Sequence, residues 1–225
     1  MTPCILYAVG AALFGYALGS VNFAIILSWL IAKRDIRKYG SGNAGSTNVV
    51  RTVGLGPGLA TFVLDFGKGA LSAWVGSLAF GYFAETVPTV GISATNGALL
   101  CGALCLLGHI FPLFFEFRGG KGVATSAGIL LVFSPWALLI ALGCFLLFFL
   151  PTRIISLGSL VAAASVPVLA IFFGDKVTTA DWFIQIGLGV VIAAAVLIRH
   201  RENIRRLLHG EEKPIRPKKK EKNDE

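Results

Sequence analysis

Charged residues are scarce in this chain. Asp, Glu, Lys and Arg make up 14% of its 225 residues, whereas hydrophobic residues make up 55%. About a quarter of the residues in a soluble domain are charged, so this composition excludes a soluble globular protein. Together with a mean hydropathy of +0.76, it predicts an all-α membrane protein with several spans.

Acidic residues are fewer than basic ones, 12 against 20, which leaves a net charge of +8. Such an excess can indicate nucleic-acid binding. Here, however, the cations lie between and after apolar runs, where membrane topology explains them. We therefore expect no nucleic-acid partner.

Cysteine is also rare, with four residues. Cys4, Cys101, Cys105 and Cys144 all fall in apolar stretches, and the pair Cys101 and Cys105, which shares a helix face, has no further ligands around it. We interpret the cysteines as small packing residues. We expect no metal site and no cofactor.

The first apolar run covers residues 5–32 and exceeds the roughly 20 residues that cross a membrane. It lacks a basic n-region and is too long for the h-region of a cleaved signal, so we expect it to be retained as a span. Gly10, Gly15 and Gly19 are typical of helices that approach closely in a membrane, and Asn22 is expected to hydrogen-bond to a neighbouring helix.

Seven transmembrane helices are predicted, with the N-terminus outside and the C-terminus cytoplasmic. Segment 123–150 decides the number, because Ser134-Pro135 in its middle allows one long helix or two short ones. Only two helices keep nearly all of the 20 lysines and arginines on the inner side, as the positive-inside rule requires. The predicted spans are 5–32, 59–83, 96–115, two within 123–150 joined by a turn at 134–136, 154–173 and 182–198.

We expect residues 1–209 to form a single seven-span membrane domain. Residues 210–225 are rich in charge and contain proline, which predicts a disordered cytoplasmic tail. For Arg205, Arg206 and this tail we prefer the interpretation of solvated, positive-inside residues over a role in a site.

Residues 40–51 form a polar, glycine-rich stretch in an otherwise apolar chain. Backbone N–H groups, the side chains of Ser41, Asn43, Ser46 and Thr47, and the charge of Arg51 suit an anion, so we interpret the stretch as a phosphate-binding loop. The letters also match G-x-G-x-x-G and approach a P-loop, but those folds need a buried strand before the loop, which is absent from the pattern. A plain flexible connector is the other alternative.

A second glycine-rich loop covers residues 119–122 and carries Lys121. It precedes a predicted helix, whose N-terminus favours negative charge. Both glycine-rich, basic segments are predicted to lie on the inner side of the membrane. The positive-inside rule accounts for their basic residues but not for their glycines, and a ligand that bears phosphate explains both features.

Asp65 and Lys68 are ionisable residues inside a predicted span, which is costly and indicates function or a structural pair. Their i, i+3 spacing allows an ion pair on one helix face. His109 lies at a similar depth in the next span, so we expect it to meet Asp65. Both alternatives, a structural pair and a pair that also faces substrate, stay open at this point.

The motifs resemble those of the bacterial acyl-phosphate:glycerol-3-phosphate acyltransferase family. The resemblance covers about residues 5–209 and rests on the stretches 40–51 (GSGNAGSTNVVR), 64–69 (LDFGKG), 108–112 (GHIFP) with 119–125 (GGKGVAT), and 199–203 (RHREN). Ala44 and Ser46 depart from the family pattern, which often has proline and alanine there. The resemblance implies a seven-span membrane enzyme of the bacterial cytoplasmic membrane, with its active site on the cytoplasmic side.

The resemblance also implies residue roles. Catalysis is expected from Ser41, Arg51, Lys121, His200 and Asn203. Substrate binding is expected from Gly42, Asn43, Thr47, Asn48, Lys68, Gly119, Gly120, Gly122, Thr125 and Ser156. Asp65 and His109 are expected to support the site, and no metal is implied.

The implied reaction moves a fatty acyl group from acyl phosphate to the 1-hydroxyl of glycerol 3-phosphate, which gives lysophosphatidic acid and phosphate. Positioning and electrostatics would supply most of the catalysis, without an acyl-enzyme. Either a histidine or the acceptor's own phosphate takes the proton, and we favour the phosphate. Membrane lipid is an expected partner and an obligatory protein partner is not. The alternative is a transporter for a phosphorylated small molecule, which the lack of an internal repeat disfavours; a non-catalytic scaffold would not explain two phosphate-type loops.

Overall fold

The computed structural model describes residues 2–86, 93–174, 176 and 178–215, with side chains from Ile5 onward. All regular elements within these residues are helices. They are α1 (Thr2–Ser20), α2 (Phe23–Ala32), η1 (Ile36–Lys38), α3 (Ser46–Thr52), α4 (Leu55–Thr86), α5 (Ala94–Ile110), η3 (Leu113–Phe115), α6 (Val123–Phe133), α7 (Pro135–Thr152), α8 (Ile155–Phe173), α9 (Thr179–Arg199) and α10 (Arg201–Leu208).

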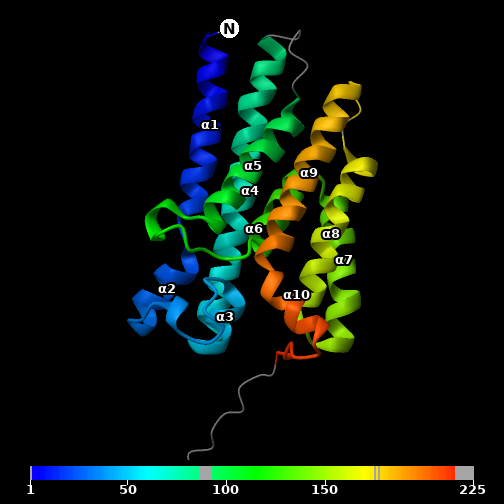
Figure 1. The fold of residues 1–225 in the computed structure, drawn as a ribbon. Helices are drawn as coiled ribbons and strands as arrows, with labels where there is room; N and C mark the ends of the chain where they lie inside the picture. Colours follow the sequence, from blue (N-terminus) through cyan, green and yellow to red (C-terminus); the bar gives the residue numbers. More distant parts are fainter. Residues whose placement is uncertain (1, 87–92, 175, 177, 216–225) are drawn as a thin grey trace, which may run out of the picture.

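The long helices form two groups that stand side by side (Figure 1). Helices α1, α4 and α5 pack together in one group, and α8 packs against α7 and α9 in the other. Contacts of α5 with α9, and of α6 with α4, α5 and α7, join the groups. Helices α2, α3 and α10 gather at the end of the bundle that lies away from the chain's N-terminus (Figure 1). We call this end the loop end.

Several helices are suited to the membrane. Five segments are long and apolar enough to cross it, and they lie within 5–32, 94–115, 135–152, 155–173 and 179–199. Helix α4 has 32 residues but carries Asp65 and Lys68, and the apolar helix α6 has 11 residues. These features agree with a multi-pass, all-α membrane protein. The count of seven spans and the orientation of the two ends stay predictions.

We had expected the first apolar run to form one continuous span. It forms two helices instead, since α1 ends at Ser20 and α2 begins at Phe23. Asn22 explains the break: its side chain accepts a hydrogen bond from the backbone N–H of Ile25 (3.1 Å) and so caps α2. The predicted interhelical bond of Asn22 was wrong, and its Nδ2 has no partner among the described residues. The freed carbonyls of Gly19 and Val21 accept hydrogen bonds from Lys68.

Other helix boundaries differ by a few residues. Helix α4 begins at Leu55 instead of residue 59, because proline at position 57 is tolerated in a first helical turn. The third span ends at Ile110, and η3 follows it. The predicted turn at 134–136 is confined to Ser134, which caps α7 by accepting a hydrogen bond from the N–H of Ala137 (3.3 Å). Helix α7 then continues two residues beyond the predicted end, to Thr152.

Two glycines of α1 allow it to approach α5 closely. A Cβ atom on Gly19 would lie 2.1 Å from the carbonyl oxygen of Cys105, and one on Gly15 would lie 2.7 Å from that of Cys101. A Cβ on Gly10 would have no neighbour within 4 Å, so its predicted packing role was wrong. Cys101 and Cys105 are buried free thiols, as expected of packing residues.

Candidate anion-binding site

A cavity of about 760 Å³ lies at the loop end of the bundle. Its walls combine both glycine-rich segments with the start of α8 and the junction of α9 and α10. The chain thus brings together segments that are far apart in the sequence. Thirteen of the predicted site residues line it: Ser41, Gly42, Asn43, Thr47, Asn48, Arg51, Asp65, His109, Lys121, Gly122, Ser156, His200 and Asn203.

The first glycine-rich segment is a loop only as far as Gly45, because helix α3 begins at Ser46. The expectation of an irregular loop through residue 51 was therefore wrong in its second half. The helical part carries Thr47 and, one turn further, Arg51 to the cavity wall. The Arg51 guanidinium is exposed, and no hydrogen bond to it is found in the part of the chain that the structure describes, so it is available to a ligand.

Asn48 gives this loop its shape. It is buried, and its Oδ1 accepts a hydrogen bond from the N–H of Ser41 (2.9 Å). Its Nδ2 donates to the carbonyls of Tyr39 (2.9 Å) and Asn43 (3.1 Å). Because both ends of the amide are bound to backbone, Asn48 supports the loop instead of offering the amide to a substrate.

The second glycine-rich loop is fixed by backbone contacts. The N–H of Gly120 donates to the carbonyl of His109 (3.1 Å), and the carbonyls of Gly119 and Gly120 each accept a hydrogen bond from Arg199 (3.2 Å). A Cβ on Gly120 would lie 2.2 Å from Nε2 of His109 and 2.6 Å from the carbonyl oxygen of Ala44. Glycine here therefore lets the two loops pack directly against each other.

Lys121 extends from this loop and donates a hydrogen bond to Oδ1 of Asn203. Burial first, and then the charges of Arg206, Arg199 and Arg51, lower the pKa of Lys121 to about 8, against the opposing effect of Glu212. Burial is thus the main cause of the low pKa and the neighbouring cations add to it, so an incoming phosphate would favour the charged lysine.

His200 lies at the end of α9, outside the span. Its Nδ1 is 2.8 Å from the carbonyl oxygen of Val196, which only accepts hydrogen bonds, so Nδ1 carries the proton and Nε2 keeps a lone pair. Burial and the charge of Lys121 lower the pKa of His200 to about 4. The imidazole is therefore neutral at pH 7.

Asp65, Lys68 and His109 form a buried cluster at the cavity wall, in which Asp65 and His109 line the cavity and Lys68 does not. The Lys68 Nζ lies 2.9 Å and the His109 Nδ1 lies 3.5 Å from Oδ1 of Asp65, which confirms the predicted meeting of His109 with Asp65. The side chains of Lys68 and Asp65 are 1% and 3% exposed. Four residues assigned to substrate binding are not on the cavity wall: Lys68, Gly119, Gly120 and Thr125.

Two functional candidates were missed by the sequence analysis, Arg206 and Glu212. Glu212 accepts hydrogen bonds from Oγ of Ser156 (2.6 Å), Nδ2 of Asn203 (2.5 Å) and Nε of Arg206 (2.5 Å). We had assigned residues 210–225 to a disordered tail. Residues 211–215 of that segment lie against the cavity, and residues 216–225 lie outside the described residues. The i, i+3 spacing of Asn203 and Arg206 is a signal that links Arg206 to the site, whereas one glutamate in a charged tail carries none.

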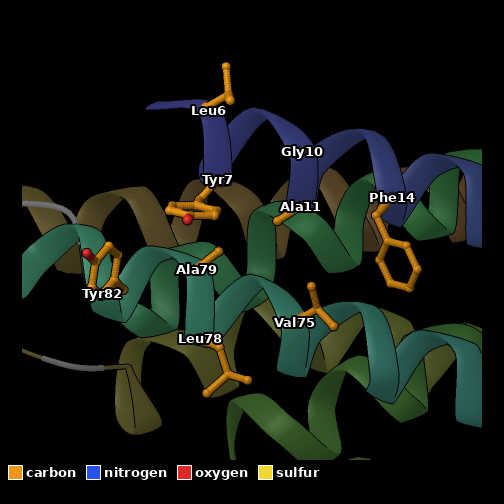
Figure 2. Close-up of a pocket in the computed structure, with 9 residues that line it drawn as sticks. All are labelled: Leu6, Tyr7, Gly10, Ala11, Phe14, Val75, Leu78, Ala79 and Tyr82. Atoms are coloured by element: carbon orange, nitrogen blue, oxygen red, sulfur yellow. The ribbon is translucent and has the colours of Figure 1, made fainter. Parts of the chain in front are cut away.

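A second cavity, of about 700 Å³, lies between α1 and α4 (Figure 2). The rings of Tyr7 and Tyr82 lie at one end of it and Phe14 lies at the other, and the ring centroids of the two tyrosines are 5.9 Å apart. Its described lining is apolar apart from the tyrosine hydroxyls. This groove therefore does not suit an anion, in contrast to the cavity at the loop end.

The fold and the site define a class: a helical membrane protein with a cation-rich polar cavity, suited to phosphate, at one end of its bundle. A family model described as glycerol-3-phosphate acyltransferase matches residues 9–210. The chain belongs to the glycerol-3-phosphate acyltransferase family.

Curated relatives agree along nearly the whole length. A glycerol-3-phosphate acyltransferase from Finegoldia magna is 39% identical over 210 residues, which cover 93% of this chain and 97% of the relative. Glycerol-3-phosphate acyltransferase 2 from Bacillus anthracis is 37% identical over 203 residues, with 90% and 96% covered.

Solved structures of PlsY, an integral membrane glycerol 3-phosphate acyltransferase, are also similar. Its glycerol 3-phosphate form has a TM-score of 0.80 and 35% sequence identity, and the match covers 93% of this chain and 96% of PlsY. Its lysophosphatidic acid form has a TM-score of 0.78 and 34% identity, with the same coverage.

Proposed function

We propose that this protein transfers a fatty acyl group from an acyl phosphate to the 1-hydroxyl of glycerol 3-phosphate, which gives lysophosphatidic acid and inorganic phosphate. The observation that carries the proposal is the cavity at the loop end, which joins both glycine-rich segments in a chain of this family. The names of the two PlsY forms, with glycerol 3-phosphate and with lysophosphatidic acid, support the acceptor and the product. The acyl phosphate donor is inferred from the family resemblance. A transporter is not favoured.

The two substrates bring two phosphate groups into one cavity, and their repulsion has to be offset. Arg51, Lys121 and Arg206 all line the cavity and supply the positive charge. Ser41 and Thr47 add hydroxyl groups for phosphate oxygens, and Ser156, His200 and Asn203 hold glycerol 3-phosphate. Fixed charges of this kind stabilise the negative charge that develops on the leaving phosphate.

The chemical step is a direct displacement. The 1-hydroxyl oxygen attacks the acyl carbonyl carbon, the bond from that carbon to the phosphate oxygen breaks, and the hydroxyl proton passes to the acceptor's own phosphate. His200 is a weak base, because its pKa is about 4. Its Nε2 lone pair instead orients the acceptor by accepting a hydrogen bond from the 2-hydroxyl of glycerol 3-phosphate, which leaves the proton of the 1-hydroxyl free to pass to the phosphate.

The cavity lies on the cytoplasmic side of the bacterial cytoplasmic membrane in this proposal. The support is the charge pattern: Arg34, Arg51, Arg153 and Arg201 all belong to segments at the loop end, as the positive-inside rule expects of a cytoplasmic face. Both substrates would enter from that side, with the acyl chain in the inner leaflet. The proposal needs no cofactor and no obligatory protein partner.

The test is phosphate release from palmitoyl phosphate by the purified, detergent-solubilised protein, with and without glycerol 3-phosphate. We expect release that depends on the acceptor and yields lysophosphatidic acid. Arg51→Ala and Lys121→Ala should each lower kcat/KM on the order of 100-fold, because each removes a charge that stabilises the transition state.

Lys176→Ala is the matched control, since it removes one exposed cation far from the cavity and near Trp182. It should keep wild-type activity. Folded wild-type protein that releases no phosphate in response to glycerol 3-phosphate would reject the proposed function.

A further inference from the structure

The segment of residues 211–215, here called the C-terminal strap, turns back onto the cavity after α10. Gly210 makes the turn with a φ of +69°, a left-handed conformation that glycine adopts without strain. The N–H of Glu211 then donates to the carbonyl of Arg206 (2.7 Å), and that of Ile215 donates to the carbonyl of Arg153 (2.9 Å). The strap is thus tied at both ends, to α10 and to the turn between α7 and α8.

Glu212, between these ties, places a carboxylate among three donors. A hydroxyl from Ser156, an amide from Asn203 and a guanidinium from Arg206 bind its two oxygens at 2.5 to 2.6 Å. This is the donor set that suits a phosphate group, because a hydroxyl, an amide and a guanidinium all donate hydrogen bonds to anionic oxygens. The Glu212 side chain is 11% exposed, so the carboxylate fills the position instead of bordering it.

The same contacts link the carboxylate to the second glycine-rich loop. Asn203 accepts a hydrogen bond from Lys121 with one end of its amide and donates to Glu212 with the other. A phosphate that bound Ser156 and Asn203 would need the place that Glu212 holds. Two anions this close repel each other, so both cannot stay.

We propose that Glu212 is an internal occupant of the acceptor's phosphate subsite and that glycerol 3-phosphate binds by displacing the strap. Glu212 is then a specificity-determining residue: it raises the KM for the acceptor and excludes weaker anions from the subsite. This inference rests on the proposed function. Burial raises the pKa of Glu212, but the same three hydrogen bonds outweigh it and hold the pKa below its ordinary value, so the carboxylate is charged at neutral pH and competes with phosphate as an anion.

Displacement requires no change in the helices. Glu211, Lys213 and Pro214 are exposed, and the strap is held by its two backbone ties and the contacts of Glu212. Once released, the carboxylate regains water, which offsets part of the cost of breaking its hydrogen bonds. The apparent affinity for the acceptor is then proportional to the fraction of protein in which the strap is released, because only that fraction can bind glycerol 3-phosphate.

The test compares Glu212→Gln with Glu211→Gln, which removes the same charge from the adjacent, exposed position. Glu212→Gln should lower the KM for glycerol 3-phosphate on the order of tenfold and leave kcat within about twofold, because the neutral amide binds the cationic subsite weakly. Glu211→Gln should leave both constants unchanged. An unchanged or raised KM in Glu212→Gln, or a loss of kcat at constant KM, would overturn the proposal, the latter in favour of a catalytic base.

A binding measurement separates this inference from the proposed function. Each full-length variant is titrated with inorganic phosphate in a calorimeter. Phosphate should bind more tightly to Glu212→Gln than to wild type or to Glu211→Gln. This result does not depend on turnover. If wild type lacked acyl transfer, the proposed function would fail, and the phosphate affinities alone would still decide whether Glu212 blocks an anion subsite: equal affinities would refute it.

Discussion

Lys121 couples the charge of the site to pH. Its pKa of about 8, well below the ordinary 10.5, results first from burial and means that the cation is present below pH 8 and is lost as pH rises through that value. If the charged form binds phosphate, kcat/KM should fall above about pH 8. The corresponding fall in kcat should occur at a higher pH, because bound phosphate favours the charged lysine.

Lys121→Arg checks this assignment, because arginine keeps its charge across the measurable range. The variant should lose the alkaline limb of kcat/KM up to about pH 10, even if its maximal rate is lower. Rates would be corrected for the spontaneous hydrolysis of acyl phosphate at each pH. An alkaline limb at the same pH in Lys121→Arg would assign the titration to another group.

His200 is expected to orient the acceptor and not to take its proton. We predict that His200→Gln lowers kcat about 10-fold to 100-fold without abolishing it, because glutamine also has an acceptor atom while the base, in our proposal, is the substrate phosphate. Steady-state rates with glycerol 3-phosphate measure the effect. Complete loss of turnover with intact binding of glycerol 3-phosphate would contradict the substrate-assisted route.

The buried ion pair between Lys68 and Asp65 should stabilise the fold. Lys68→Met leaves the buried Asp65 without its cation, which destabilises the fold by about 3–5 kcal/mol. The double variant with Asp65→Asn should recover part of this loss, since no buried charge is then unpaired. Melting temperatures in detergent provide the measurement, and equal melting of the single and double variants would argue against a structural ion pair.

At the scale of elements, the contact between the two glycine-rich loops is the feature with the clearest consequence. Gly120→Ala would place a Cβ 2.2 Å from His109 and 2.6 Å from the carbonyl of Ala44, so the loop that carries Lys121 has to shift. We expect a loss of kcat/KM on the order of 100-fold, since small misplacements of catalytic groups have large effects.

Gly143→Ala in α7 is the control, because a Cβ there meets nothing within 4 Å. It should keep full activity and be as stable as wild type or slightly more so, given the higher helix propensity of alanine. Gly120→Ala should still fold, as judged by its elution as a single species in detergent. Normal activity of a folded Gly120→Ala variant would show that the loops do not need this approach.

Elements also differ in how well local sequence predicts them. The break at Ser134 and the start of α6 after Gly122 follow from capping and glycine, which act over one turn, and both were predictable. The break at Asn22 was not, because an apolar run of that length also suits a single span. It depends on Lys68, which lies far along the chain and binds the carbonyls that the break frees.

For the whole molecule, the prediction concerns orientation. With an odd number of spans, the ends would lie on opposite sides of the membrane, and we predict that the basic loop end faces the cytoplasm. A reporter that fluoresces only in the cytoplasm should be active when fused after Glu225 and inactive when fused before Met1. Activity at both ends would require an even number of spans and would exclude seven.

Composition and local pattern alone determined that the chain is an all-α membrane protein, that it has two glycine-rich basic segments suited to anions, and that Asp65 can pair with Lys68, because hydrophobicity, capping and i, i+3 spacing act over one or a few turns. Only the tertiary structure decided which groups share the cavity. It brought Lys121 within hydrogen-bond distance of Asn203 and Ser156 within hydrogen-bond distance of Glu212. It also showed that the Asn48 side chain binds the backbone of its own loop. Such contacts join distant segments through the packing of the whole bundle, and a single carboxylate in a charged tail has no local signature of its partners.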